Sequence, residues 1–205
     1  RDMAYAASRY TEVKLDSAAA ELFRDINKNV VDFMDNYDGT LKEPTLLPTS
    51  FPNILVNPNQ GIAVGMASNI CSFNLREVCQ ATIGYLKSKN CDIFEHIIAP
   101  DFSTGGEIIY NKEDMRAILE SGRGSFKVRA RYRFDKKNNC IEVYEIPYST
   151  STEVIIDKII ECVKAGKAKE ISDVRDETDK TGLKITIDVK RNTDVDKLMA
   201  RLFKM

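Results

Sequence analysis

A tyrosine and an arginine stand side by side near the start of the sequence, in the run "ASRYTEVKL". A phenol has a pKa of about 10, so it needs a nearby cation or base before it can act as a nucleophile. Arg9 supplies a fixed positive charge beside Tyr10, and small neighbours such as Ala7 and Ser8 leave the hydroxyl open to approach. The same residues also fit an ordinary tyrosine whose ring is packed and whose hydroxyl is hydrogen-bonded. From these residues alone, both a packing role and a chemical role stay open.

The composition predicts a globular chain with a core of its own. The 205 residues are 43% hydrophobic and 30% charged, with a formal net charge of −1, which excludes a disordered chain. No stretch reaches the roughly 18 apolar residues of a membrane span, and the first residues lack a secretory signal pattern. We therefore expect a soluble, cytoplasmic protein without a membrane partner. The five cysteines have no CxxC spacing and there is one histidine, so neither a metal site nor a disulfide framework is expected.

Helical periodicity marks several segments of the first half. The run "AAAELFRDINKNVVDFM" predicts a helix with Asp16 or Ser17 as its N-cap, and "NLREVCQATIGYLKSK" predicts one capped by Asn74. A short helix is expected around "DIFEHI", and another between the cap Asn111 and the stop Gly122. The proline-rich run "DNYDGTLKEPTLLPTSFPNILVNPNQG" predicts irregular structure and contains the domain boundary.

The second half predicts a sheet with helices. In "SFKVRARYRF" apolar and cationic residues alternate without a break, which indicates one strand, and "DKKNN" then leads by a hairpin to "CIEVYEIPY". A helix over "TEVIIDKIIECVKAG", a strand over "LKITIDVK" and a final helix from Asp194 follow. The fold class is therefore expected to be α+β, with a largely antiparallel sheet covered by helices on one face.

The cationic face of the strand from Lys127 to Arg133 has two interpretations. It can be a solvated face whose cations pair across the sheet with Glu142 and Glu145 in weak ion pairs. It can instead follow a phosphate backbone, because evenly spaced cations neutralise phosphates and release counterions. Arg123, flanked by glycines in "GRG", would add a cation where a backbone can come close.

The run "LVNPNQGIAVGMASNI" also has two interpretations. One is a tight glycine turn that buries Ile62 and Val64; the other is an apolar wedge on a polar loop, of the kind that enters a base step and kinks duplex DNA. The glycine spacing of membrane helix pairs is present without a long apolar stretch, and the lysine of a phosphate-binding loop is missing.

Eight blocks of the sequence resemble, in order, the A subunit of bacterial type IIA DNA topoisomerases, the family of DNA gyrase and topoisomerase IV. They run through "ASRYTEVKL", "VDFMDNYDGTLKEPTLLPTSFPNILVN", "GIAVGMASNI", "PDFSTGGEII", "SGRGSFKVRA", "YEIPY", "ISDVRDETDKTGLKITIDVKR" and "LMARLFKM". Ser8 and "CSF" depart from the residues that the family commonly has there. The resemblance implies that residues 1–45 end a winged-helix domain and that residues 46–205 form the tower domain.

The resemblance also implies roles for individual residues. Tyr10 falls on the nucleophile that becomes linked to a 5′ phosphate of DNA, and Arg9 on the arginine that assists it. Ile62 falls on the isoleucine that the family inserts between base pairs to bend the DNA. Further DNA contacts are expected from residues near the wedge and on the basic strand: Asn57, Gln60, Asn69, Arg123, Lys127 and Arg129.

The partners and cofactors follow from the same resemblance. The family acts on duplex DNA as a homodimer of A subunits joined by two B subunits, and the B subunit holds Mg²⁺ and ATP. The helix-turn-helix part is expected before Arg1, and the coiled coil and DNA-wrapping domain after Met205, so the chain alone should cleave DNA negligibly. The alternative is a non-catalytic DNA-bending module that uses Ile62 and the basic strand but has no use for Arg9 and Tyr10.

Overall fold

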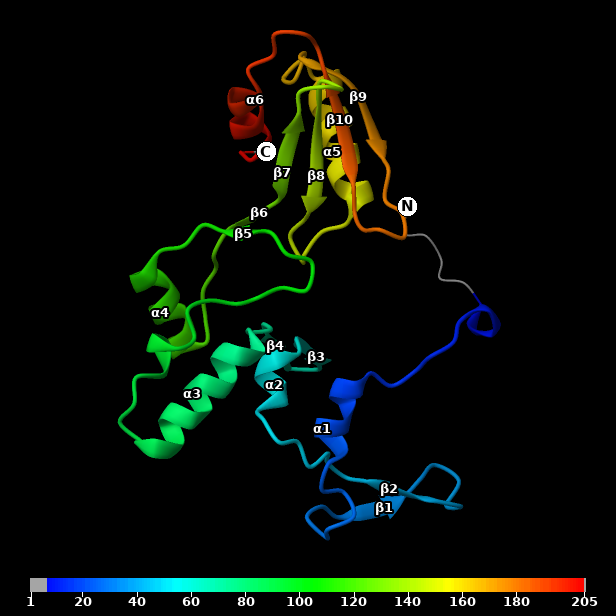
Figure 1. Cartoon of the computed structure of the whole chain (residues 1–205), viewed down its shortest axis with the longest axis vertical. Coiled ribbons are helices and arrows are strands. Elements are labelled where there is room, and N and C mark those ends of the chain that lie inside the picture. The colour runs from blue at the N-terminus through cyan, green and yellow to red at the C-terminus, as the bar shows by residue number, and fades with distance from the viewer. Residues whose placement is uncertain (1–6, 205) are drawn as a thin grey trace. The chain divides into compact units, whose positions relative to one another are not determined.

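The computed structural model describes residues 7–204 of the chain. The chain divides into two compact units, Arg1–Ile98 and Ala99–Met205. Residues 1–6 and 205 lie outside the described part, and with them Met205, which ends the last family-like block. Helices and antiparallel strands occur in both units (Figure 1), which confirms the predicted α+β class. Within residues 7–204, no helix is long and apolar enough to span a membrane.

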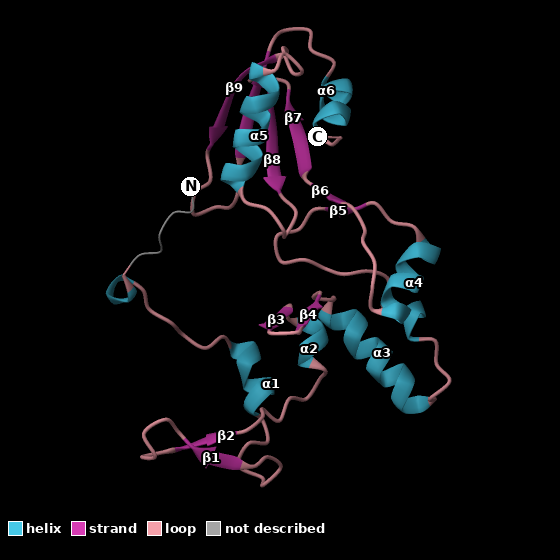
Figure 2. Cartoon of the chain, turned by 180° about the vertical axis from the view of Figure 1, so that it is seen from behind, coloured by secondary structure: helices cyan, strands magenta, loops and turns pink. Residues whose placement is uncertain are grey.

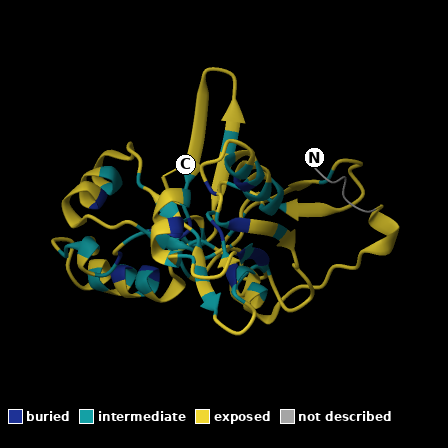
Figure 3. Cartoon of the chain, turned by 90° about the horizontal axis from the view of Figure 1, so that it is seen from above, coloured by how far each residue is buried: buried dark blue, intermediate teal, exposed yellow. Residues whose placement is uncertain are grey.

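The first unit consists of short elements and one long helix. Its 3-10 turns are η1 (Ser8–Tyr10), η2 (Ser17–Ala19) and η3 (Ile93–Glu95), its helices are α1 (Ala20–Phe23), α2 (Asn53–Val56) and α3 (Leu75–Lys87), and its strands are β1 (Phe33–Asp35), β2 (Lys42–Pro44), β3 (Asn59–Ala63) and β4 (Met66–Ile70). The core of this unit is small, because its buried apolar cluster comprises Val78, Ala81 and Ile97, with α2 packed against it. Figure 3 shows the buried positions as short dark stretches on the helices and strands.

The first predicted helix is much shorter than expected. Asp16 does cap it, because its carboxylate accepts a hydrogen bond from the Ala18 N–H. The helix ends at Phe23, and turns follow it. Asn29 adopts a left-handed conformation with φ 58°, which no α-helix can contain, and the β-branched pair that follows favours extended backbone. The prediction of helix as far as Met34 is therefore wrong.

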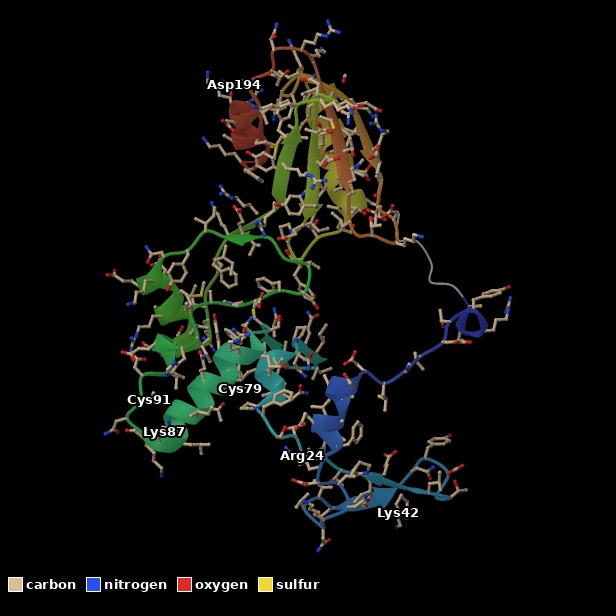
Figure 4. The ribbon with its side chains drawn as sticks, viewed as in Figure 1. Arg24, Lys42, Cys79, Lys87, Cys91 and Asp194 are labelled. Atoms are coloured by element: carbon tan, nitrogen blue, oxygen red, sulfur yellow. The ribbon has the colours of Figure 1, made fainter. Side chains whose placement is uncertain are left out.

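The proline-rich run is more regular than predicted. Strands β1 and β2 pair in antiparallel register, with Phe33 opposite Pro44 and a Lys42–Asp35 ion pair (2.5 Å) beside the ladder (Figure 4). Gly39, with φ 68°, completes the turn between them. The whole run was predicted to be irregular, and the prediction is wrong where β2, α2 and the start of β3 form.

The caps predicted at Asn74 and Asn111 and the stop at Gly122 were correct, whereas the short helix expected around "DIFEHI" is the 3-10 turn η3. Asn74 accepts a hydrogen bond from the Arg76 N–H at the start of α3, and Asn111 does the same for Glu113 and Asp114 at the start of α4 (Lys112–Ser121). Gly122 ends α4 with a φ of 66°. Side-chain oxygens at these N-caps satisfy backbone donors that a helix leaves unpaired, which is why the sequence signal is reliable.

A four-stranded antiparallel sheet forms the centre of the second unit. Its strands are β7 (Arg131–Asp135), β8 (Cys140–Glu145), β10 (Ile185–Val189) and β9 (Ile171–Asp176), in that spatial order. A separate pair is formed by β5 (Glu107–Ile108) and β6 (Val128–Arg129), and the helices are α4, α5 (Thr152–Lys164) and α6 (Val195–Leu202). The final helix begins after Asp194, as predicted, and Asp194 caps it by accepting a hydrogen bond from the Lys197 N–H.

One face of the sheet carries the core of this unit. Ile187 lies opposite Ile141, and Ile185 lies opposite Val143, so alternate residues of β8 and β10 point to the same side. Side chains of α5 and α6 cover them, among them the buried Ile159, Leu198 and Met199. In the reverse view of Figure 2, α5 lies in front of the strands. The predicted one-sided cover of helices is confirmed.

Two strand predictions needed correction. The basic strand is broken at Ala130, because β6 pairs with β5 whereas β7 pairs with β8. Strand β9 was not predicted at all. A bulge between Asp188 and Val189 lets Ile171 and Val174 both contact the core although they are three residues apart, and this spacing hides the two-residue period of a strand.

The other face of the sheet carries a network of opposite charges. Glu142 binds Arg133 (2.5 Å) and Lys184 (3.0 Å), and Lys184 also binds Glu177 (3.0 Å). Arg175 pairs with Asp173, Glu177 and Asp188. Hydrogen bonds from Lys184, Thr186 and Arg175 lower the pKa of Glu177 to about 2. The charges on this face therefore largely neutralise one another.

The core position Ile187 offers a test of the sheet. Its side chain is 1% exposed, so Ile187→Ala should lower the free energy of unfolding by about 2–5 kcal/mol. Ile109→Ala, at a position that is 57% exposed, should change it by no more than about 0.5 kcal/mol. Urea denaturation of both variants measures the difference, and equal losses would contradict this description of the core.

The charge network predicts a pH dependence of stability. Because the pKa of Glu177 is lowered from 4.5 to about 2 in the folded chain, its contribution is complete above pH 4.5 and is lost as the pH falls towards 2. Glu177→Gln should therefore flatten the loss of stability over this range. Urea midpoints across the acid range would measure it, with Glu161→Gln on α5 as the matched control; identical curves for both variants would refute the network's role.

Candidate tyrosine site and nucleic-acid interface

Tyr10 is the last residue of η1, a 3-10 helix of one turn. Its backbone N–H donates to the Ala7 carbonyl (2.9 Å), and the Thr11 hydroxyl donates to the Ser8 carbonyl (3.1 Å). These short-range bonds define the turn although it has no buried residue. The Tyr10 side chain is 72% exposed, so the alternative of a packed ring is wrong. Its hydroxyl can be approached from outside.

Arg9 lies directly against Tyr10. Its Nη2 donates a hydrogen bond to the tyrosine Oη (3.3 Å), and its Cζ lies 4.7 Å from the ring centroid. Both contacts bring positive charge to the phenol, where it would stabilise a phenolate or an approaching phosphate. The structure thus brings together the two residues that the sequence proposed as a chemical pair.

Ile62 lies near the tip of the hairpin formed by β3 and β4. The strands pair in antiparallel register, and Val64 and Gly65 make the connecting turn, with φ 83° at Gly65. Ile62 is 86% exposed and Val64 is fully exposed. The interpretation as a turn that buries both residues is therefore wrong, and an apolar side chain presented to the outside remains.

The register of the hairpin places particular residues around Ile62. Ala67 lies directly opposite it, and the pair Gln60 and Asn69 lies two residues farther from the tip, on the same face. Exposed amides therefore flank an exposed apolar side chain. An amide can donate to and accept from base edges and sugars, which is the combination found beside wedges that enter the minor groove.

Two glycines shape this hairpin. A Cβ at Gly61 would lie 2.8 Å from Ser68 Oγ, so glycine lets the two strands keep their spacing at this rung. At Gly65 the positive φ disfavours any other residue. The sequence pattern did not single out Val64 and Met66 as exposed. The two-residue loop between the strands would have indicated that these side chains are exposed, because a hairpin tip without a covering element cannot bury its side chains.

Asn57 lies outside the hairpin and does not share the face formed by Ile62, Gln60 and Asn69. It ends α2, and its amide donates to Asn53 Oδ1 (2.6 Å). Its side chain is exposed before β3 begins. It is therefore available to a ligand, but it is not aligned with Gln60 and Asn69.

The arginines of the predicted basic strand are paired with carboxylates. Arg129 binds Glu107 (2.8 Å), and Arg131 binds Glu145 (3.2 Å). Arg133 binds Glu142, and this hydrogen bond, with that of Lys184, lowers the pKa of the Glu142 carboxyl. The interpretation as a face paired across the sheet is confirmed for Arg131 and Arg133.

Arg123 and Lys127 belong to the same unit and lie between α4 and β6. Both side chains are exposed, and neither makes an ion pair with the residues described, 7–204. The Arg123 N–H donates to Ser121 Oγ (3.3 Å), which helps to fix the turn. These two cations are free to meet an anion, whereas Arg129 would first have to leave Glu107 or share it.

One group of side chains, Asp135, Cys140 and Glu142, does not suit magnesium. Asp135, Cys140 and Glu142 place one potential ligand atom each within 4.8 Å of one another. Glu142 already binds two cations, and burial raises the pKa of the Cys140 thiol. Magnesium requires oxygen ligands in octahedral geometry, and a group with one thiol and an already paired carboxylate does not offer them.

Comparisons with known proteins identify relatives of this chain. The sequence profile of the family that comprises the A subunits of DNA gyrase and topoisomerase IV matches residues 1–205. The DNA gyrase A subunit of Mycoplasma genitalium is 42% identical over 204 residues, which cover 97% of this chain and 24% of that protein. The DNA gyrase A subunit of Halalkalibacterium halodurans is 43% identical over 208 residues, which cover 98% of this chain and 25% of that protein.

The chain spans about a quarter of the length of the curated relatives that it matches. Both the profile and the relatives extend over nearly all of it, from the tyrosine turn to the last helix. The chain therefore belongs to the family formed by the A subunits of DNA gyrase and topoisomerase IV.

Proposed function

We propose that this chain is the breakage-reunion segment of a type IIA DNA topoisomerase, with Tyr10 as the nucleophile. The contact between Arg9 and the exposed Tyr10 hydroxyl is the observation that carries the proposal. The contact between the guanidinium and the phenol stabilises the fold by no more than about 1 kcal/mol, because both residues are exposed. It has value for a reaction in which a phenol attacks a negatively charged phosphodiester.

The reaction would proceed by in-line exchange at phosphorus. The Tyr10 oxygen forms a bond to the phosphorus while the bond to the 3′ oxygen breaks; the phenol loses its proton and the 3′ oxygen gains one. Arg9 stabilises the phenolate and the charge of the five-coordinate phosphoryl group. The phosphotyrosine link conserves the bond energy, so attack by the 3′ hydroxyl reseals the strand and releases Tyr10.

The β3–β4 hairpin would bend the DNA. Ile62 would enter a base step, and Gln60 and Asn69, on the same face, would contact the adjacent bases or sugars. Asn57 would contact DNA beside the hairpin. In the second unit, Arg123, Lys127 and Arg129 would contact the phosphate backbone, Arg129 at the expense of its pair with Glu107.

The remaining parts of the activity belong to a larger assembly. We propose a homodimer of A subunits joined by B subunits in the cytoplasm, with ATP and Mg²⁺ bound by the B subunits. We also propose that residues 1–45 end the winged-helix domain and that residues 46–205 form the tower domain. A chain with one nucleophile and no magnesium site among its described residues would then have negligible cleavage activity alone. A non-catalytic bending module would use Ile62 equally well but leaves the Arg9–Tyr10 contact without a role.

The role of Tyr10 is tested by trapping the covalent intermediate. The complete A subunit with Tyr10→Phe, combined with its B subunit, Mg²⁺ and end-labelled duplex, should lose 5′-linked product by roughly 10³-fold or more, because the nucleophilic oxygen is gone. Denaturing gels measure the amount of 5′-linked product. DNA binding measured in parallel should be unchanged. If Tyr10→Phe yields as much 5′-linked product as the native protein, Tyr10 is not the nucleophile; if neither protein yields any while both bind DNA, the bending module replaces the enzyme.

The role of Ile62 is tested by bending. Ile62→Ala should reduce both the DNA bend, measured by energy transfer between duplex ends, and the cleavage yield, about tenfold or more, because the wedge no longer offsets the cost of deformation. Val64→Ala is the matched control, since it removes an equally exposed apolar side chain from the turn of the same hairpin. Equal effects of both changes would exclude a specific wedge at Ile62.

A further inference from the structure

Three loops meet at one end of the four-stranded sheet. They are the turn between β7 and β8 (136–139, with Asp135 at the end of β7), the loop between α5 and β9 (165–170) and the loop between β10 and α6 (190–194). The backbone N–H of Val189 donates to the Asn139 carbonyl (3.2 Å) and that of Lys190 to the Glu170 carbonyl (2.8 Å). Figure 4 marks this end of the unit by Asp194, at the start of α6.

The three loops carry a concentration of positive charge. Their six cations are Lys136, Lys137, Lys167, Lys169, Lys190 and Arg191, which we call the loop-end basic surface. All six are exposed, and none of them makes an ion pair with the residues described, 7–204. This contrasts with the arginines of β6 and β7, whose charges are neutralised by neighbouring carboxylates.

The carboxylates of these loops are already engaged. Asp135 accepts hydrogen bonds from the Lys137 N–H (2.8 Å) and the Asn138 amide (2.7 Å). Glu170 pairs with Arg201 (2.5 Å), and Asp194 caps α6 and pairs with Lys197 (3.1 Å). The surface therefore keeps an excess of positive charge, with six cations against the Asp135 carboxylate and the already paired Glu170 and Asp194, although the whole chain has a net charge of −1.

The backbone of the surface is held in place. Each loop contains one residue in the left-handed region, namely Asn139 (φ 54°), Gly166 (φ 73°) and Asn192 (φ 62°). Such residues make tight turns at little steric cost. Lys190 adds a bond from its Nζ to the Lys169 carbonyl (2.6 Å). A ligand would therefore meet cations on ordered loops, which reduces the entropy lost on binding.

We infer that the loop-end basic surface binds the phosphate backbone of duplex DNA, an inference that rests on the proposed function for its substrate. None of the three loops carries an exposed large apolar residue, whereas protein interfaces usually need apolar or aromatic anchors. Clustered cations without anchors suit a polyanion, which they bind by releasing counterions and without reading sequence. This surface would thus hold DNA independently of the wedge.

The test compares two fourfold variants of the complete A subunit in complex with its B subunit. The first combines Lys136→Gln, Lys167→Gln, Lys169→Gln and Arg191→Gln. The matched control removes four exposed cations elsewhere, by Lys87→Gln, Lys89→Gln, Lys112→Gln and Lys180→Gln. Figure 4 shows Lys87 at the end of α3, in the other unit. The affinity for a labelled duplex is titrated at several salt concentrations.

The slope of log affinity against log salt should fall by about 2–4 units in the first variant, with a loss of affinity of about tenfold or more, since each lost phosphate contact contributes about 0.9. The control should keep the native slope. Equal slopes for both variants would overturn the inference, as would unchanged DNA binding with weakened assembly with the B subunit, which would indicate an acidic protein partner. Covalent trapping by the native complex tests the proposed function separately, because it does not depend on either variant.

Discussion

The register between β8 and β10 is the constraint on which the second unit depends. It sets Ile187 beside Ile141 on one face and Thr186 beside Glu142 on the other. A slip of one residue would exchange the faces, burying carboxylates under α5 and α6 and exposing the isoleucines. The free energy gained by burying the core therefore also fixes the charge network and the loops at the end of the sheet.

The first unit follows a different principle. Its buried cluster is small, and the side chains that matter for the proposed chemistry are held by bonds between near neighbours: a 3-10 turn for Tyr10 and a two-stranded hairpin for Ile62. Two paired strands alone are marginally stable in water. Residues exposed to this degree can reach a large ligand such as duplex DNA, and their order then depends partly on that ligand.

The sequence predicted those features that are determined locally. The caps at Asn74 and Asn111 and the helix start at Asp194 were correct because each interaction spans only a few residues. Strand β9 and the break at Ala130 were missed because they depend on partners distant in sequence. The exposure of Ile62 was suggested by the family resemblance, since hydrophobic pattern alone favoured burial. Pairing of the basic strand with Glu142 and Glu145 was anticipated, but the pair of Arg129 with Glu107 was not, because the two residues lie far apart in the chain.

The number of cations in a segment of the sequence does not show how many of them are free to bind a ligand in the folded chain. The strand with the densest cations in the sequence carries little free charge, since antiparallel pairing sets carboxylates opposite its arginines. The loops look ordinary in sequence, with cations in three separate places, but the sheet brings their ends together while its charged face already uses the nearby acids. A chain with a net charge near zero can therefore have a strongly positive surface. Folding places paired cations and carboxylates on the face of the sheet and leaves an excess of cations on the loop-end basic surface.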